Sequence, residues 1–170
     1  MRRGTRLSFE ARDIHIVTMT MYQRILVPVD GSDTANRGLA EALKLAQALG
    51  AQVRLVHVVD QSSLALNPEA GVAAAPLAED FSEDGRTVLE EARQLAAAQG
   101  VTVETVLHEN FTGRVANLIV EEAKTSRAEL IVMGTHGRRG IRHAVLGSDA
   151  EAVVHATTVP VLLVRLPGRK

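Results

Sequence analysis

The sequence predicts an α/β fold, an open five-stranded parallel sheet with helices on both faces. Two observations support this prediction. Short, almost entirely apolar runs alternate along the chain with longer segments whose apolar residues recur every three or four positions. Runs of the first kind are typical of strands buried on both faces. Their alternation with helices is typical of a parallel sheet covered by its crossover helices.

The first half of the chain predicts two strands that flank a helix. The run RILVPV at residues 24–29 is the first strand, and QVRLVHVV at 52–59 is the second. Gly50 ends the helix between them as a C-terminal cap. The apolar face of that helix consists of Leu39, Ala42, Leu43, Ala46 and Leu49. Residues 60–79 are rich in Ala, Pro and Gly without a clear period, so we expect a surface loop with no more than a helical turn.

The second half predicts two helices, three strands and the start of a final helix. The strands cover residues 101–108, 129–134 and 159–165. A helix over 82–99, closed by Gly100, presents one apolar face that consists of Val88, Leu89, Ala92, Leu95 and Ala96. A helix over 112–126 buries Val115, Leu118, Ile119 and Ala123. The final helix begins at Ser148.

Composition limits the class of protein. The chain has 170 residues, 46% of them apolar, which is enough for one domain with a sizeable core. Nineteen basic residues against twenty acidic ones argue against a general nucleic-acid binder, so any anion site must be local. The absence of cysteine excludes disulfides and thiol chemistry. With neither a membrane-length apolar run nor a secretory signal, we expect a soluble, cytoplasmic protein that does not bind membranes.

Residues 1–20 differ from the rest of the chain. They contain four arginines, show no sustained period and end just before Met21. We interpret them as a poorly ordered N-terminal extension ahead of a single domain over residues 21–167. Two explanations stay open. The extension is either a non-native start or a basic targeting or docking arm, although Glu10 and Asp13 interrupt its positive charge.

Two loops with unusual chemistry follow strands of the predicted sheet. PVDGSDT, at residues 28–34, follows the first strand, and the glycine-rich stretch GTHGRRGIRHAVLGS, at 134–148, follows the fourth. Right-handed crossovers place the carboxyl ends of all strands at one edge of a parallel sheet, and ligands bind there where the strand order reverses. We therefore expect both loops to contribute to one site.

The glycine-rich stretch has the spacing G-x2-G-x9-G-S, formed by Gly134, Gly137, Gly147 and Ser148. Glycine at the end of a strand allows backbone angles that other residues avoid, and it lets a ligand approach the peptide groups. The helix that begins at Ser148 offers unpaired amides and the positive end of its dipole to an anion. The loop between carries Arg138, Arg139, Arg142 and His143. Together these features predict a cradle for a polyphosphate.

Other interpretations of these motifs exist. Ser148 and Glu151 also form a capping box, S-x-x-E, which needs no ligand and is compatible with phosphate on the remaining amides. GRRG at 137–140 matches the loop of KH RNA-binding domains, but it follows a strand rather than joining two helices. Pro28 stands where a haloacid-dehalogenase phosphatase would need its nucleophilic aspartate. His57 and His108 fall within strands, and we expect them to be hydrogen-bonded at the surface or the end of the sheet. No histidine pair has the helical spacing of a zinc site.

The chain from residue 22 to 165 resembles the ATP-binding branch of the universal stress protein family. The resemblance rests on RILVPVDGSDTA, LVHVVD and LIVMGTHGRRGIRHAVLGSDAEAVV followed by VPVLLVR. It implies a Rossmann-like fold of the adenine-nucleotide α-hydrolase-like class. It also implies a homodimer, which we expect to form through the edge strand 159–165. The residues that would contact ATP by this resemblance are Pro28, Val29, Asp30, Val58, Met133, Gly134, His136, Gly137, Arg138, Gly147, Ser148, Asp149 and Ala150.

The resulting functional hypothesis is a nucleotide-dependent stress-response or signalling module rather than a dedicated enzyme. No group of residues supplies a base that would activate water, so we expect hydrolysis to be slow at most. Asp149 would repel a phosphate nearby unless its side chain points away or Mg²⁺ lies between them. Two alternatives remain open: an enzyme that cleaves adenine nucleotides or transfers an adenylyl group, and a dimeric scaffold with a vestigial nucleotide site.

Overall fold

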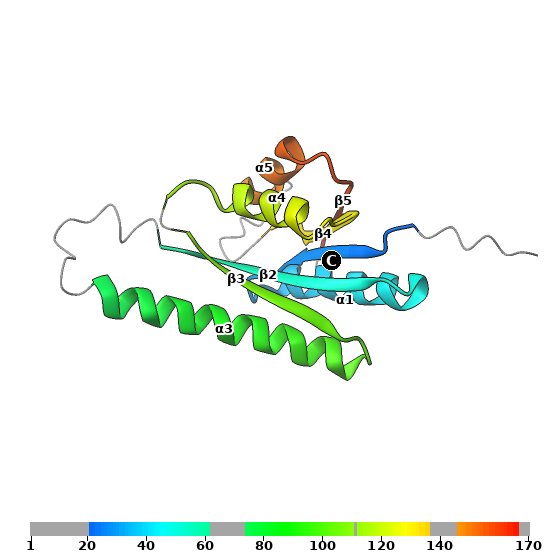
Figure 1. Cartoon of the computed structure of the whole chain (residues 1–170), viewed down its shortest axis with the longest axis horizontal. Coiled ribbons are helices and arrows are strands. Elements are labelled where there is room, and N and C mark those ends of the chain that lie inside the picture. The colour runs from blue at the N-terminus through cyan, green and yellow to red at the C-terminus, as the bar shows by residue number, and fades with distance from the viewer. Residues whose placement is uncertain (1–20, 62–73, 111, 137–145, 167–170) are drawn as a thin grey trace, which may run out of the picture.

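The computed structural model describes residues 21–61, 74–110, 112–136 and 146–166. Five strands form one sheet: β1 (Arg24–Pro28), β2 (Gln52–Asp60), β3 (Val103–Asn110), β4 (Leu130–Gly134) and β5 (Val161–Val164). The strand order is β3-β2-β1-β4-β5, and every neighbouring pair is parallel. The predicted fold class is therefore confirmed, with β5 at one edge beside β4 as expected (Figure 1).

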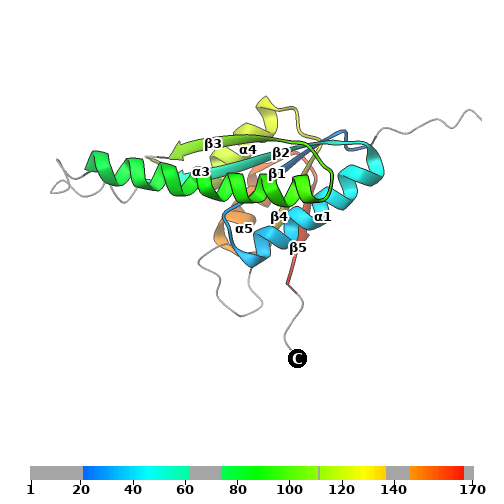
Figure 2. The same ribbon diagram turned by 90° about the horizontal axis from the view of Figure 1, so that it is seen from below.

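Helices cover both faces of the sheet (Figures 1 and 2). On one face, α1 (Asp33–Leu49) and α3 (Ala74–Ala98) pack on the strands, and Leu39 and Leu89 are buried there. On the other face lie α4 (Val115–Thr125) and α5 (Ser148–Ala156), with Ile119 and Val153 in the core. Alternate strand residues supply the two cores, because neighbours in a strand point to opposite faces.

Capping residues stand at both ends of α1, and the one at the C-terminal end agrees with the sequence prediction. Ser32 is the N-cap, and its hydroxyl accepts a hydrogen bond from the Ala35 amide at 3.2 Å. Gly50 ends the helix in the left-handed conformation at φ 66°. The predicted apolar face is buried except for Leu49, which is half-buried.

The start of α3 differs from the prediction. The helix begins at Ala74 rather than near Ser82, so part of the expected loop is helical. Alanine has the highest helix propensity, and Pro76 is tolerated because it lies in the first turn. Leu95, predicted to be buried, is 45% exposed because it lies at the margin of the buried stripe. The stripe also contains Gly85, where an added Cβ would lie 2.6 Å from Val59 Cγ2, so this glycine lets the helix approach the sheet.

All five strands differ from the predicted bounds by one or two residues at an end, and two of them differ at both ends. β3 covers Val103–Asn110 instead of 101–108, and β5 is shorter than expected, at Val161–Val164. Within the described residues, no helix is both long and apolar enough to cross a membrane.

Candidate functional site

The reversal of strand order occurs between β1 and β4. The chain leaves β1 to form α1 on one face of the sheet, and after β4 it forms α5 on the other face. The carboxyl ends of these two neighbours therefore border a crevice, the usual ligand position in an open α/β sheet. Both loops that the sequence analysis selected begin at this point, as predicted.

Three predicted site residues form a row on the α4 and α5 side of the sheet. Met133 is buried, and Val58 packs against the same core cluster. Pro28 follows Leu26, a member of that cluster, by two positions and so points to the same face. Because Pro28 pairs with Val56 of β2, the three apolar side chains come from adjacent strands near their carboxyl ends.

Val29 points the other way. Its side chain is only 3% exposed and packs under α1, while its amide donates to the Val56 carbonyl at 2.9 Å. Its carbonyl oxygen lies 2.7 Å from Nδ1 of His57, a buried side chain in the middle of β2. The prediction that His57 is hydrogen-bonded is confirmed, but the side chain is buried rather than at the surface or end of the sheet. Nδ1 must carry the proton in this bond. Its position next to the end of β1 was not predicted, and the only signal is one imidazole within an apolar run.

Asp30 shapes the turn after β1. Its Oδ1 accepts a hydrogen bond from the Ser32 amide at 3.0 Å, and Gly31 between them has φ 79°. A carboxylate that bonds the backbone two residues later is a common turn device, and glycine adopts this φ without strain. The side chain of Asp30 thus has a local structural role in addition to the ligand contact proposed below.

Gly134 is needed for close packing rather than for unusual backbone angles. A Cβ at this position would lie 2.8 Å from the carbonyl carbon of Thr34 in the first turn of α1. One turn further along α1, a Cβ at Gly38 would lie 3.2 Å from the Gly134 nitrogen. Gly134 is not among the described glycines with positive φ, so the expectation of special angles there was wrong. Two backbones instead meet at this point.

Gly147 closes the base of the glycine-rich loop. Its amide donates to the Thr135 carbonyl at 2.8 Å, so residues on either side of the loop are joined directly. A Cβ on Gly147 would lie 3.0 Å from the same oxygen, so lack of space for a side chain explains why this residue is glycine. Its φ of −62° is ordinary and does not require glycine. His136 follows Thr135, whose hydroxyl lies 3.0 Å from His136 Nδ1. The predicted contacts Gly137 and Arg138 lie outside the described residues, as do Arg139, Arg142 and His143.

The capping-box prediction was wrong. The helix α5 begins at Ser148 as predicted, but its N-cap is Gly147, which has no side chain to cap the first amides. Ser148 is one residue inside the helix because the bond between Gly147 and Thr135 fixes Gly147 at the cap position. The first amides of α5, which the helix itself does not pair, are thus not covered by an N-cap side chain.

The charges at the start of α5 have opposite effects on helix and ligand. Asp149 and Glu151 lie in its first turn and favour the helix dipole. Both side chains are exposed, whereas Ala150 is buried. Among the described residues, no group of three or more His, Cys, Asp or Glu side chains could hold a metal ion. A Mg²⁺ ion between Asp149 and a phosphate therefore stays a prediction that depends on the nucleotide.

Comparison with known proteins shows where the chain belongs. The model of the universal stress protein family matches residues 21–165. Universal stress protein MJ0531 of Methanocaldococcus jannaschii is 35% identical over 150 residues, which cover 88% of this chain and 86% of the relative.

Solved structures share the fold. MJ0577 of the same organism, described as a hypothetical protein, has a TM-score of 0.77 at 25% identity and covers 88% of this chain and 99% of its own. A universal stress protein in complex with cAMP has a TM-score of 0.59 at 26% identity, and the match covers 86% of this chain and 99% of that protein. The Archaeoglobus fulgidus protein in complex with dAMP has a TM-score of 0.60 at 25% identity, with 85% and 98% covered. The family match and the shared fold together show that this chain belongs to the universal stress protein family.

Proposed function

We propose that this universal stress protein binds ATP at the carboxyl ends of β1 and β4 and serves as a nucleotide-dependent stress-response or signalling module. The observation that carries the proposal is the junction of Thr135 and Gly147, which sets the start of α5 next to the end of β4. Amides and the positive dipole end at a helix start attract phosphate. The similar structures with cAMP and dAMP support an adenine nucleotide as the ligand.

Each predicted residue has a role in this proposal. The nucleoside lies against the apolar row of Pro28, Val58 and Met133, and Asp30 with the adjoining backbone of Val29 recognises the adenosine. The ribose and phosphates lie along the glycine-rich loop and the start of α5, where they meet Gly134, His136, Gly137, Arg138, Gly147, Ser148, Asp149 and Ala150. Mg²⁺ relieves the repulsion between Asp149 and the phosphate tail.

Bound ATP acts by changing which conformation is populated. The ligand joins the turn after β1 to the start of α5, two segments on opposite faces of the sheet. A ligand that favours one arrangement of these segments shifts the surface offered to a partner. Hydrolysis is slow or absent in this account.

The proposal includes a two-fold homodimer through β5. This strand is at the edge of the sheet, and Leu162 on it is 39% exposed. An open apolar edge favours aggregation, and pairing with its own copy covers it. Pro160, which has no amide hydrogen, lies just before the strand and limits the pairing to residues beyond it.

Mass spectrometry of small molecules released from the purified full chain tests the proposal. We expect adenine nucleotide, and we expect calorimetry on the emptied protein to show ATP binding. Release of AMP and pyrophosphate from added ATP would instead support the enzyme alternative. If the protein carries no nucleotide and does not bind added ATP, the scaffold alternative remains.

A further inference from the structure

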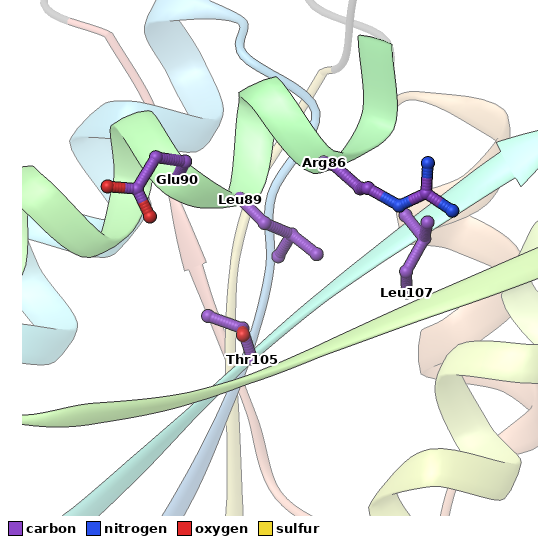
Figure 3. A pocket seen from close by; sticks show the side chains of 5 residues that line it. All are labelled: Arg86, Leu89, Glu90, Thr105 and Leu107. Carbon is purple, nitrogen blue, oxygen red and sulfur yellow. The ribbon is translucent and has the colours of Figure 1, made fainter. Parts of the chain in front are cut away.

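Two hollows lie along the seam between α3 and the edge strand β3, away from the β1–β4 crevice. The first, about 250 Å³ in volume, has Leu89, Thr105 and Leu107 along it, with Arg86 and Glu90 above on α3 (Figure 3). The second, about 210 Å³, is lined by Gln61, Ala78, Glu79, Ser82, Arg86 and Glu109. Arg86 lines both hollows, and we call the surface that contains them the α3–β3 seam.

The second hollow contains a buried acceptor that lacks a donor. Gln61 is fully buried, and its amide nitrogen donates to the Ala78 carbonyl at 3.1 Å and to the Ser82 hydroxyl at 3.2 Å. Its side-chain oxygen has no hydrogen-bond partner within the part of the chain that the structure describes. A buried acceptor without a partner is costly, so this position calls for a donor from elsewhere.

The rim of the same hollow has excess negative charge. Glu109 is exposed, and one of its carboxylate oxygens accepts a hydrogen bond from Ser82 at 2.7 Å. Arg86, the one cation among the described residues that line the hollow, pairs with Glu83 at 3.1 Å. No cation among the described residues forms an ion pair with Glu79 or Glu109. The hollow therefore suits a ligand group that is positively charged and rich in N–H donors, which describes a guanidinium.

We propose that the α3–β3 seam docks residues 1–20 of the same chain, and that an arginine of this segment enters the second hollow. Its guanidinium donates to the Gln61 oxygen and pairs with Glu79 and Glu109. The segment has the matching charge, since it carries four arginines, Arg2, Arg3, Arg6 and Arg12, against two acidic residues. The rest of the chain has a negative net charge, with 15 basic residues against 18 acidic ones, because the whole chain has 19 basic and 20 acidic residues.

The segment is long enough to reach the hollow. Arg24, three residues after Met21, pairs with Gln52 of β2, and the β2 partner of Glu109 lies seven residues further along that strand. At about 3.3 Å per residue, Glu109 is roughly 33 Å from Met21 along the sheet. Twenty extended residues span up to about 66–72 Å, so residues 1–20 cover this distance with length to spare.

A spin label on the extension tests the proposal in the full chain. The protein has no cysteine, so Thr5→Cys provides a single labelling position. We expect the label to broaden the backbone amide NMR signals of Ser82, Arg86 and Glu109, and to leave those of Glu121 on α4 and Glu151 on α5 sharp. Uniform broadening, or none at the seam, would overturn the proposal.

Charge variants and a mixing experiment complete the test. We expect Glu79→Gln and Glu109→Gln each to weaken docking by roughly two- to fivefold, the range for an exposed ion pair, and salt to weaken it further. The matched control Glu121→Gln, an exposed glutamate on the opposite face, should leave the broadening unchanged. Broadening that persists in the double variant contradicts the assigned hollow. In the mixing experiment, isotope-labelled protein without a spin label is combined with spin-labelled protein without isotopes. Broadening of the isotope-labelled signals would show docking between molecules and overturn docking within one chain.

Discussion

The amide of Gly147 and the carbonyl of Thr135 are joined by a 2.8 Å hydrogen bond that spans the glycine-rich loop. Because Thr135 directly follows β4 and Gly147 directly precedes α5, this bond positions the helix start relative to the sheet. The amides of α5 therefore have a fixed place at the carboxyl edge.

Gly147→Ala tests the importance of this junction. The added Cβ would lie 3.0 Å from the Thr135 oxygen, so the two segments must move apart by a few tenths of an ångström, which strains this hydrogen bond. We expect ATP binding to weaken strongly by calorimetry while urea unfolding remains cooperative. Gly50→Ala controls for a general loss of stability, since an alanine there strains the left-handed backbone at φ 66° but meets no other group and lies at the far end of α1. Unchanged ATP affinity in Gly147→Ala would separate the junction from the ligand site.

Asp30 has a role in the turn and a proposed role in ligand binding, and two substitutions distinguish them. Asp30→Asn keeps an oxygen that can accept from the Ser32 amide, whereas Asp30→Ala loses this turn contact as well as the charge. We expect both variants to weaken ATP binding by about 1.5–3 kcal/mol, the range for a hydrogen bond to a charged group. Only the alanine variant should also lower the free energy of unfolding. Wild-type ATP affinity in Asp30→Asn would leave Asp30 with the turn role alone.

The strand and helix pattern was predictable because each element carries its own periodicity. The α1 face of Leu39, Ala42, Leu43 and Ala46 is buried as its spacing indicates. The start of α3 was not predictable from apolar periodicity. The alanine-rich residues before Ser82 have a high helix propensity, but they form no apolar stripe that would reveal the helix.

The meeting of the two loops that form the candidate site followed from topology, but its detailed geometry did not. Parallel strands end at one edge, so the two unusual loops had to meet near β1 and β4. The reason for Gly134, by contrast, is contact with Thr34 about one hundred residues away in the sequence. The capping box failed similarly, because the long-range bond of Gly147 to Thr135 overrides a local side-chain preference. Tertiary contacts of this kind leave no local signal.

A buried carboxylate within an ion cluster predicts acid sensitivity. Glu122 on α4 has a side chain only 6% exposed, 2.8 Å from Arg54 and 2.9 Å from His108. Burial raises the pKa of Glu122, but the hydrogen bonds from Arg54 and His108 outweigh burial and hold the pKa below its usual value of 4.5. A lowered carboxyl pKa contributes stability that is present above the unfolded pKa and is lost as pH falls through the folded pKa.

We therefore expect the free energy of unfolding in urea to fall below about pH 4.5 in the wild type and to fall less steeply in Glu122→Gln. At neutral pH that variant should be less stable by about 1–3 kcal/mol. Glu104→Gln is the control, because Glu104 contacts the same Arg54 but its side chain is 70% exposed. Equal slopes in the wild type and in Glu122→Gln would contradict the assignment.

Leu162 tests the proposed dimer. Leu163 is half-buried against the α4 and α5 core, so a charge there would also disturb folding, whereas Leu162 is 39% exposed. We expect light scattering to show a wild-type dimer and a monomeric or aggregated Leu162→Lys variant. Leu95→Lys on α3, where the leucine is 45% exposed, should stay dimeric. A monomeric wild type, or a dimer that tolerates Leu162→Lys, would exclude β5 as the contact.

The central claim, that backbone amides of α5 bind the phosphates of ATP, is tested most directly by Ser148→Pro. Ser148 is exposed at the first helical position, where proline is well tolerated, and Gly147 before it already has the extended angles φ −62° and ψ 147° that proline requires. The substitution thus removes one amide hydrogen and preserves the helix. Ser148→Ala is the matched control, since it removes the hydroxyl and keeps the amide. Calorimetry should show ATP binding weakened by about 1.5–3 kcal/mol, roughly ten- to hundredfold, in Ser148→Pro and a much smaller change in Ser148→Ala. Wild-type affinity in Ser148→Pro would contradict the claim.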